Sequence, residues 1–213
     1  MKENKIMTIY MKSLRERILE TAMSAFAKEG VKAVKMDDIA RRLSISKRTL
    51  YEIYENKESL LCEGLKKYKT EKEREQTEIY KNSKNVMDTI LYVYRQKVVE
   101  FKKTCPEFYA EIVKYPSVVK LFQEDRQLSH ERMMIFLKRG VDEGYFRSDV
   151  NLELASKMFD AISVYIMKNQ LYKQFTIEQL FHDFVFVSLR GFCTPEGVRI
   201  LDENLSSEPD TAL

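Results

Sequence analysis

Residues 36–57, MDDIARRLSISKRTLYEIYENK, decide the fold. Ile39, Ala40 and Leu43 fall on one stripe of a helix, whereas the two arginines between Ala40 and Leu43 point away from that stripe. The pattern predicts a short helix that buries one apolar side and exposes a basic one.

A second short helix is predicted directly after the first. Ser44 and Ile45 make a tight turn, and the hydroxyl of Ser46 caps a helix over residues 47–54. Leu50, with Ile53 or Tyr54, faces inward on this helix. The side chains left at its exposed amino-terminal end are Lys47, Arg48, Thr49 and Tyr51. This arrangement is typical of a helix-turn-helix, whose second helix reads base edges in the major groove of DNA.

The same residues carry a family resemblance over roughly the first third of the chain. The positions that resemble the DNA-binding signature of TetR-family bacterial transcriptional regulators are Ile39-Ala40, Ile45-Ser46, Thr49-Leu50-Tyr51, Tyr54, Lys57-Glu58 and Leu60-Leu61. An amphipathic helix over residues 14–28, ended by Gly30, precedes them. Residues 140–150 resemble the segment before the last two helices in many such regulators. Three positions depart from the family pattern: Lys35 replaces a capping Thr or Ser, Ser44 a Gly or Ala, and Ile53 a His or Tyr.

The resemblance implies an all-α fold of about nine helices. The expected organisation is a three-helix DNA-binding domain over residues 1–56, an effector-binding and dimerisation domain over 57–202, and a flexible tail over 203–213. Six glycines and four prolines among 213 residues agree with long helices and few breakers. Beyond residue 56, we expect helices over 57–81, from 86 to about 104, and over 106–115, 117–141, 152–173 and 177–190.

Residues in the first domain are expected to contact DNA in two ways. Lys57, Tyr51 and Lys35 are candidates for phosphates, and Lys47, Arg48 and Thr49, on the helix that Ser46 caps, are candidates for base edges. Lys35 is alternatively a solvated surface residue, and Tyr51 alternatively packs against the first helix. Residues 1–60 carry 13 Lys and Arg against 9 Asp and Glu, so the positive charge is concentrated where phosphate binding needs it.

The last two long helices, 152–173 and 177–190, carry more apolar residues than one buried face needs. The excess predicts that they pack against a second copy, as in family dimers, although both could instead be internal. The expected interface residues are Phe159, Ile162, Ile166, Phe181, Phe184, Val185 and Leu189.

The resemblance also implies a cavity for a small effector in the larger domain. The residues expected in that region are Tyr92, Phe108, Tyr109, Phe122, Met133, Met134, Met158 and Tyr165. Such side chains are more often plain core. If the cavity is present, their character favours an apolar or aromatic effector.

Other classes of function find little support in the sequence. Cys62, Cys105 and Cys193 are widely spaced, and only His130 and His182 could join them, so we expect no metal, no cofactor and no catalytic centre. No signal peptide or membrane-spanning segment is apparent, which predicts a cytoplasmic protein beside the chromosome. The expected function is that of a homodimeric, ligand-released repressor on a palindromic operator. A nucleoid-associated or cell-division protein that uses the same fold is the alternative.

Overall fold

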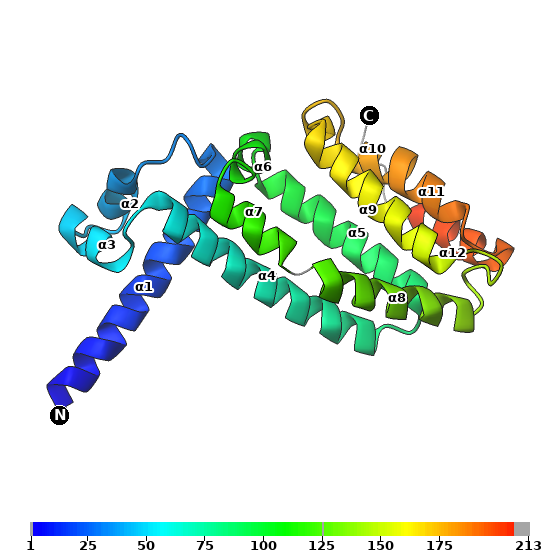
Figure 1. Cartoon of the computed structure of the whole chain (residues 1–213), viewed down its shortest axis with the longest axis horizontal. Coiled ribbons are helices and arrows are strands. Elements are labelled where there is room, and N and C mark those ends of the chain that lie inside the picture. Colours follow the sequence, from blue (N-terminus) through cyan, green and yellow to red (C-terminus); the bar gives the residue numbers. More distant parts are fainter. Residues whose placement is uncertain (1, 125, 207–213) are drawn as a thin grey trace. The chain divides into compact units, whose positions relative to one another are not determined.

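The computed structural model describes residues 2–124 and 126–206, with side chains placed for 11–124 and 127–206. Throughout these ranges the secondary structure is helical, apart from an isolated antiparallel bridge between Phe146 and Cys193 (Figure 1). The predicted all-α fold is confirmed. No helix in the described part of the chain has both the length and the apolar composition to span a bilayer.

The chain divides into two compact units. The first unit combines the residues up to Glu73 with Lys103–Glu124, and the second combines Arg74–Lys102 with the residues from 126 onward. The division falls inside α4 (Lys57–Asn82) and at the end of α5 (Val86–Lys103). The first unit thus contains a segment, 103–124, that the sequence analysis placed in the effector domain.

The first unit begins with α1 (Lys2–Glu29), which ends where Gly30 takes a left-handed backbone, φ +87°. The short helices α2 (Met36–Arg42) and α3 (Lys47–Ile53) follow, and α4 starts three residues later. Two further short helices belong to this unit, α6 (Pro106–Ile112) and α7 (Pro116–Gln123). Each starts at a proline, whose missing N–H costs nothing in a first turn.

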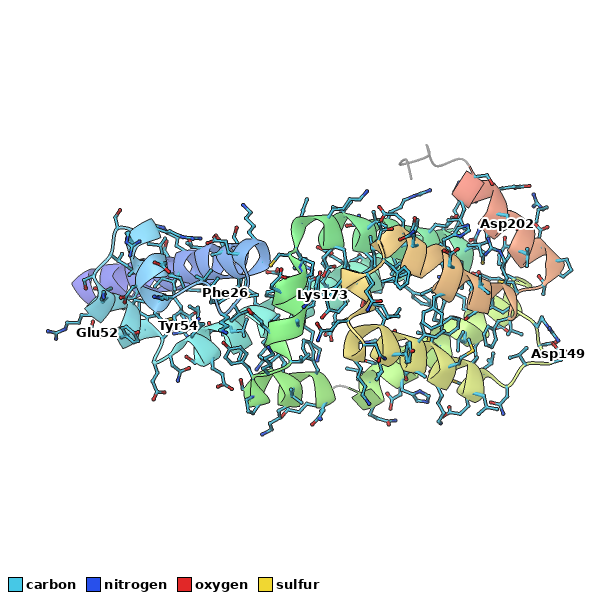
Figure 2. The ribbon with its side chains drawn as sticks, turned by 90° about the horizontal axis from the view of Figure 1, so that it is seen from above. Phe26, Glu52, Tyr54, Asp149, Lys173 and Asp202 are labelled. Carbon is cyan, nitrogen blue, oxygen red and sulfur yellow. The ribbon has the colours of Figure 1, made fainter. Side chains whose placement is uncertain are left out.

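One apolar core holds the first unit together. Its fully buried members come from all of α1 to α4 and include Ile18, Phe26, Ile39, Leu50 and Leu60. Figure 2 shows Phe26 among these helices and Glu52 at the edge of the unit. Segment 103–124 joins the same core through α6 and α7. The DNA-binding motif is therefore built on a core wider than the three predicted helices.

The second unit consists of the end of α4 from Arg74, α5, α8 (Arg126–Asp142), α9 (Leu152–Lys168), a 3-10 turn over Leu171–Lys173, a helical run over 177–190, and α12 (Pro195–Ser206). The corner between α4 and α5 is fixed from α8. Arg139 donates to the carbonyl oxygens of Tyr80 (2.7 Å) and Ser83 (3.0 Å), and Glu143 accepts the N–H of Val86 at 2.7 Å. These contacts satisfy backbone groups that helix ends leave unpaired.

The run over 177–190 begins as predicted. Thr176 accepts the N–H of Gln179, and the Gln179 side chain accepts the N–H of Thr176 in return. The run comprises α10 (Ile177–Leu180), the π-helical segment Phe181–Phe186, and α11 (Val187–Arg190).

The π-helical segment has a packing cause. In an α-helix, residues five apart differ in direction by about 140°. A turn that closes through i→i+5 hydrogen bonds brings such residues onto one side. Phe181 and Phe186 accordingly both pack on Tyr94, with ring centroids 5.1 and 5.2 Å from the tyrosine ring.

Two predicted helices are wrong in length. The helix expected over 117–141 is two helices, α7 ending at Gln123 and α8 beginning at Arg126, because α7 packs Val118 and Leu121 in the core of the first unit whereas α8 belongs to the second unit. The helix expected over 152–173 ends at Lys168, where Gln170 takes a left-handed backbone of φ 52° before a 3-10 turn at 171–173.

The carboxyl-terminal boundary also differs from the prediction. Residues 203–206, assigned to a flexible tail, form the last turn of α12, while 207–213 lie outside the described residues. Val198, Leu201 and Leu205 recur at helical spacing, and Leu201 is fully buried. The polar character of the segment concealed this apolar stripe.

Candidate nucleic-acid interface

The turn between α2 and α3 is closed by backbone hydrogen bonds. Ile45 N–H donates to the carbonyl oxygen of Ala40 at 3.0 Å, and Ser44 takes a left-handed backbone of φ 54°. That conformation favours glycine, and the TetR-like pattern has a small residue at this position. The serine at position 44 therefore carries a modest backbone strain in exchange for the tight turn.

The start of α3 is capped as predicted. The Ser46 hydroxyl oxygen accepts the N–H of Thr49 at 3.0 Å and lies 2.8 Å from the Thr49 hydroxyl. Thr49 is half-buried, and its hydroxyl is already partnered in the free protein. The Thr49 methyl group is therefore the part of the side chain that can make an apolar contact.

The buried and exposed sides of α3 agree with the sequence pattern. Leu50 is fully buried and Tyr54, rather than Ile53, is the second inward anchor. Arg48 and Tyr51 are exposed, with 88% of the Arg48 side chain accessible. The amino-terminal half of α3 thus presents polar groups on a rigid apolar base.

Every basic side chain between residues 41 and 48 has a carboxylate partner. Lys47 pairs with Asp37 of α2, and Arg48 pairs with Glu52 one turn further along α3, at 2.9 Å. The two arginines at the end of α2 are also paired: Arg41 with Asp38 at 3.4 Å and Arg42 with Glu29 at 2.7 Å. The hydrogen bond that the Arg48 guanidinium donates to Glu52 raises the pKa of the guanidinium.

Lys35 is the N-cap residue of α2, but its side chain makes no capping bond, since an ammonium has no acceptor. Asp38 compensates in part by accepting the N–H of Lys35 at 3.0 Å, and this bond lowers the pKa of the Asp38 carboxyl. The residue that replaces a capping hydroxyl therefore leaves its charge available.

The Lys57 ammonium, predicted to bind a phosphate, already donates hydrogen bonds within the protein. It donates to the carbonyl oxygens of Val31 (2.7 Å) and Lys32 (3.5 Å), and burial lowers its pKa. From the other side, the Glu111 carboxylate of α6 accepts the N–H of Lys32 at 2.7 Å. Lys57 and Glu111 together hold the loop that leads into α2.

A second anchor, which the sequence analysis missed, fixes the end of α3. Arg15 of α1 donates to Glu63 of α4 at 3.0 Å and to the carbonyl oxygen of Ile53 at 3.3 Å. The Tyr54 hydroxyl donates to Glu63 at 3.1 Å, and the Arg15 guanidinium lies 4.6 Å from the Tyr54 ring centre. Arg15 and Glu63 are 48 residues apart, so no local pattern could have paired them.

The predicted effector region does not form one group within either unit. Phe108, Tyr109 and Phe122 belong to the first unit, where Phe108 is part of the core. The other five belong to the second unit: Tyr92, Met133, Met134, Met158 and Tyr165. Met133 and Met134 pack partly buried against the core of that unit, whereas Tyr92 and Tyr165 are exposed.

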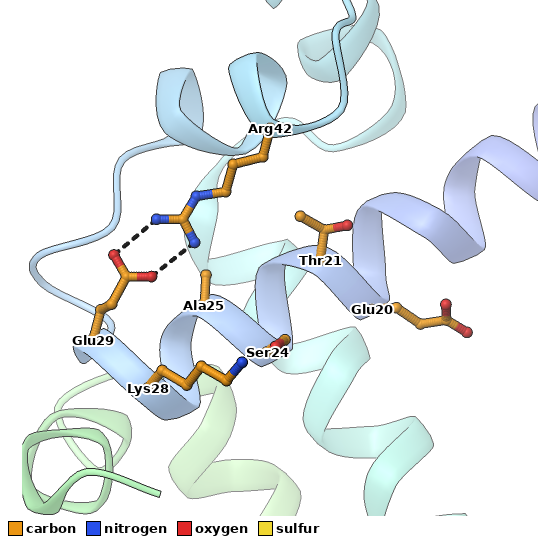
Figure 3. Close-up of a pocket in the computed structure, with 7 residues that line it drawn as sticks. All are labelled: Glu20, Thr21, Ser24, Ala25, Lys28, Glu29 and Arg42. Atoms are coloured by element: carbon orange, nitrogen blue, oxygen red, sulfur yellow. Dashed lines mark hydrogen bonds and ion pairs between the residues drawn. The ribbon is translucent and has the colours of Figure 1, made fainter. Parts of the chain in front are cut away.

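A polar groove lies along α1 and the end of α2, and none of the residues that line it is a predicted effector residue. It is open, with a volume of about 460 Å³, and the Arg42–Glu29 ion pair crosses it (Figure 3). The residues that line it are Glu20, Thr21, Ser24, Ala25, Lys28, Glu29 and Arg42.

The predicted dimer residues divide between two environments. Ile162 and Leu189 are 8% and 6% exposed and are buried within the second unit itself. Their burial needs no second copy, so their role as interface residues stays a prediction. Phe159, Phe181 and Val185 pack partly buried against the core of the same unit, while Ile166 and Phe184 are half-buried.

An apolar surface that the prediction did not name lies on the other side of these helices. On α9, Leu154 is 65% and Tyr165 is 54% exposed, and on α11 Val187 is 58% exposed. The Tyr165 and Phe184 rings lie 6.2 Å apart, so α9 meets the π-helical segment before α11 at this surface.

Comparisons with known proteins agree with the geometry of the motif. Residues 18–63 match the family described as bacterial regulatory proteins, tetR family. The chain is 25% identical over 187 residues to the HTH-type transcriptional repressor KstR2 of Rhodococcus jostii (strain RHA1), covering 85% of this chain and 92% of the relative. It is also 25% identical over 192 residues to KstR2 of Mycobacterium tuberculosis (strain ATCC 25618 / H37Rv), covering 87% and 96%.

Solved structures have the same fold. A TetR-family transcriptional regulator from Agrobacterium tumefaciens superposes with a TM-score of 0.69 at 17% identity, covering 86% of this chain and all of that one (100%). A putative transcriptional regulator from Saccharomonospora viridis, in complex with choline, gives 0.68 at 17% identity, covering 86% and 99%. Residues 18–63 therefore form a DNA-binding domain of the tetR-family type, and the relatives that the chain resembles over most of its length are transcriptional regulators, not enzymes.

Proposed function

We propose that this regulator is a homodimeric repressor that holds α3 in the major groove of a palindromic operator and leaves it when a small effector binds. The observation that carries the proposal is the exposed amino-terminal half of α3, whose position is fixed by the Ser46 cap, buried Leu50 and the Arg15–Glu63–Tyr54 contacts. A reading helix must be rigid for base contacts to discriminate.

The candidate contacts are of two kinds: contacts with base edges, which read the sequence, and contacts with phosphates, which position the motif. Lys47 and Arg48 donate to guanine acceptors and the Thr49 methyl group touches thymine, each base contact being typically worth about 1–3 kcal/mol of discrimination. Lys35 and Tyr51 position the motif on the phosphates. Lys57 acts mainly by holding the loop before α2, with one N–H of its ammonium left for a phosphate.

The dimer forms through the exposed apolar surface of α9 and α11. Leu154, Ala161 and Tyr165 are spaced seven and four residues apart, so they make one stripe, which Phe184 and Val187 continue. A contiguous apolar surface of this kind is rarely left in water. Pairing two copies here supplies the two half-site readers, which must lie one helical turn of DNA, about 34 Å, apart.

The effector is expected in the second unit, among Met133, Met134 and Met158, and to be apolar or aromatic. One observation supports a small ligand: a neighbour of the same fold was solved in complex with choline. By reciprocity, effector binding must weaken operator binding by the factor by which the operator weakens effector binding, typically about 5- to 150-fold. Replacing Met134 with Trp should abolish the effector response and spare operator binding by the ligand-free protein.

The test is selection of duplexes from a randomised library by the full-length protein, followed by genome-wide occupancy. A repressor should enrich one palindrome and occupy one or a few promoters. Enrichment without a consensus and occupancy at many dispersed sites would support the nucleoid-associated alternative instead.

A further inference from the structure

The basic residue at the start of α3 is held by a carboxylate from a different helix. Lys47 pairs with Asp37 of α2, and the two side chains remain 68% and 38% accessible. The pair therefore lies at the surface that α3 offers to DNA. Unlike the Arg48–Glu52 pair, which any helix with this spacing forms, it depends on the packing of α2 against α3.

We propose that Asp37 is a specificity-determining residue that acts without touching DNA, by competing with phosphates for the Lys47 ammonium. The proposal rests on the proposed placement of α3 in the major groove. A DNA phosphate and the Asp37 carboxylate are partners of the same kind for the Lys47 ammonium, because both accept hydrogen bonds through anionic oxygens. Replacing Asp37 by a phosphate as the partner of Lys47 therefore gains little free energy, and on non-specific DNA Lys47 stays paired with Asp37.

A correct base pair offers something different. Guanine presents two acceptors, O6 and N7, at a fixed place in the major groove, and both are available to Lys47 only when α3 is in register. Lys47 then leaves Asp37 on the specific site alone. Asp37 thus lowers affinity for DNA in general more than it lowers affinity for the operator.

The two complexes should differ in salt dependence. Each phosphate neutralised by a cation steepens the slope of log Kobs against log salt by about 0.9. In an Asp37→Asn variant the unpaired Lys47 gains a phosphate on non-specific DNA. On the operator, Lys47 already contacts a base, so the variant gains no new phosphate contact.

The experiment measures binding of the full-length protein to a random-sequence 30-bp duplex and to the duplex enriched from a randomised library. For Asp37→Asn, affinity for random DNA should rise about 5- to 10-fold near 0.1 M salt, with a slope steeper by about 0.9. Affinity for the enriched duplex should rise only about 2- to 5-fold, the effect of breaking one exposed ion pair, with an unchanged slope. A gain of binding cannot result from damage to the fold.

Two controls test whether Asp37 acts through Lys47. In a Lys47→Ala background, Asp37→Asn should leave the slope on random DNA unchanged. Glu55→Gln removes a negative charge from the same unit, at an exposed residue that makes no ion pair within the described part of the chain, and should leave both slopes unchanged.

An unchanged slope on random DNA for Asp37→Asn, or a change that persists without Lys47, would overturn this inference. If Lys47→Ala itself left the affinity for the enriched duplex unaltered, the proposed placement of α3 would fail as well. The two failures are therefore distinguishable.

Discussion

Helices α3 and α9 each have a buried and an exposed side, but their exposed sides differ in chemistry. On α3 the buried side is Leu50, with Tyr54 just beyond its end, and the exposed side carries Lys47 and Arg48. On α9 both sides are apolar: Ala155 and Ile162 are buried, whereas Leu154 and Tyr165 are exposed.

This difference explains which assignments from sequence were accurate. Where one side of a helix is charged, polarity alone identifies the side that packs. Where both sides are apolar, sequence shows that two surfaces will be covered and leaves open which residues belong to which. The polar exposed side suits a phosphate backbone, and the apolar one suits a second copy of the chain.

The largest expected effect is a loss of stability caused by a substitution on the buried side of α9. Ile162→Asp places a carboxylate without a partner inside the second unit and should lower the free energy of unfolding by roughly 3–5 kcal/mol. Urea denaturation followed by circular dichroism measures it, with Val164→Asp, at an exposed position of the same helix, as control. If the Ile162→Asp variant were a folded monomer with the urea midpoint of the wild type, Ile162 would belong to the dimer interface instead.

The next effect concerns the exposed side of the same helix. Tyr165→Asp should leave helicity and monomer stability nearly unchanged and prevent dimerisation, which light scattering detects. Operator affinity should fall about 100-fold or more, because the second half-site no longer binds as part of one molecule. Tyr165→Phe is the matched control and should remain dimeric. An intact dimer for Tyr165→Asp would place the interface on another surface.

On the exposed side of α3, the prediction distinguishes a residue that contacts a base from a residue that only positions the motif on DNA. Arg48→Ala should relax the preference at one base pair in each half-site by about 1–3 kcal/mol. Lys57→Ala, which frees the loop before α2, should instead weaken binding to every sequence alike. Affinity measured across a randomised operator library distinguishes the two patterns. Uniform loss for Arg48→Ala would remove Arg48 from the groove.

The smallest effect concerns the anchor of α3 and depends on pH. The hydrogen bond from Arg15 is the largest cause that lowers the pKa of the Glu63 carboxyl in the folded protein. A carboxyl with a lowered pKa adds stability above its unfolded pKa of about 4.3, and this stability is lost as pH falls through the folded value.

Glu63→Gln should therefore cost about 1 kcal/mol at pH 7, a value limited by solvent screening of a partly exposed pair. Its difference from wild type should shrink as pH falls from the unfolded pKa of about 4.3 through the lowered folded pKa of Glu63, because protonated Glu63 and the glutamine of the variant are both uncharged. Chemical denaturation at pH 7 and pH 3.5 measures this, with Glu55→Gln as control. A difference that stays constant with pH would mean that the charge of Glu63 does not support the anchor.

The sequence by itself determined the features whose cause is local. The Ser46 cap, the reciprocal Thr176–Gln179 cap, the stop at Gly30 and the inward Leu50 each depend on residues a few positions apart, and all are present in the structure. The all-α class followed for the same reason. The stripe of Val198, Leu201 and Leu205 was equally local and was missed because charged neighbours surround it.

Only the tertiary structure decided contacts between distant residues. The Arg15–Glu63–Tyr54 anchor, the loop held by Lys57 and Glu111, and the Asp37–Lys47 pair each join separate helices. The same holds for the choice between Ile162 and Tyr165 as the covered side of α9. A periodic pattern states how often apolar residues recur along a helix, whereas packing in three dimensions decides which of them the chain covers itself.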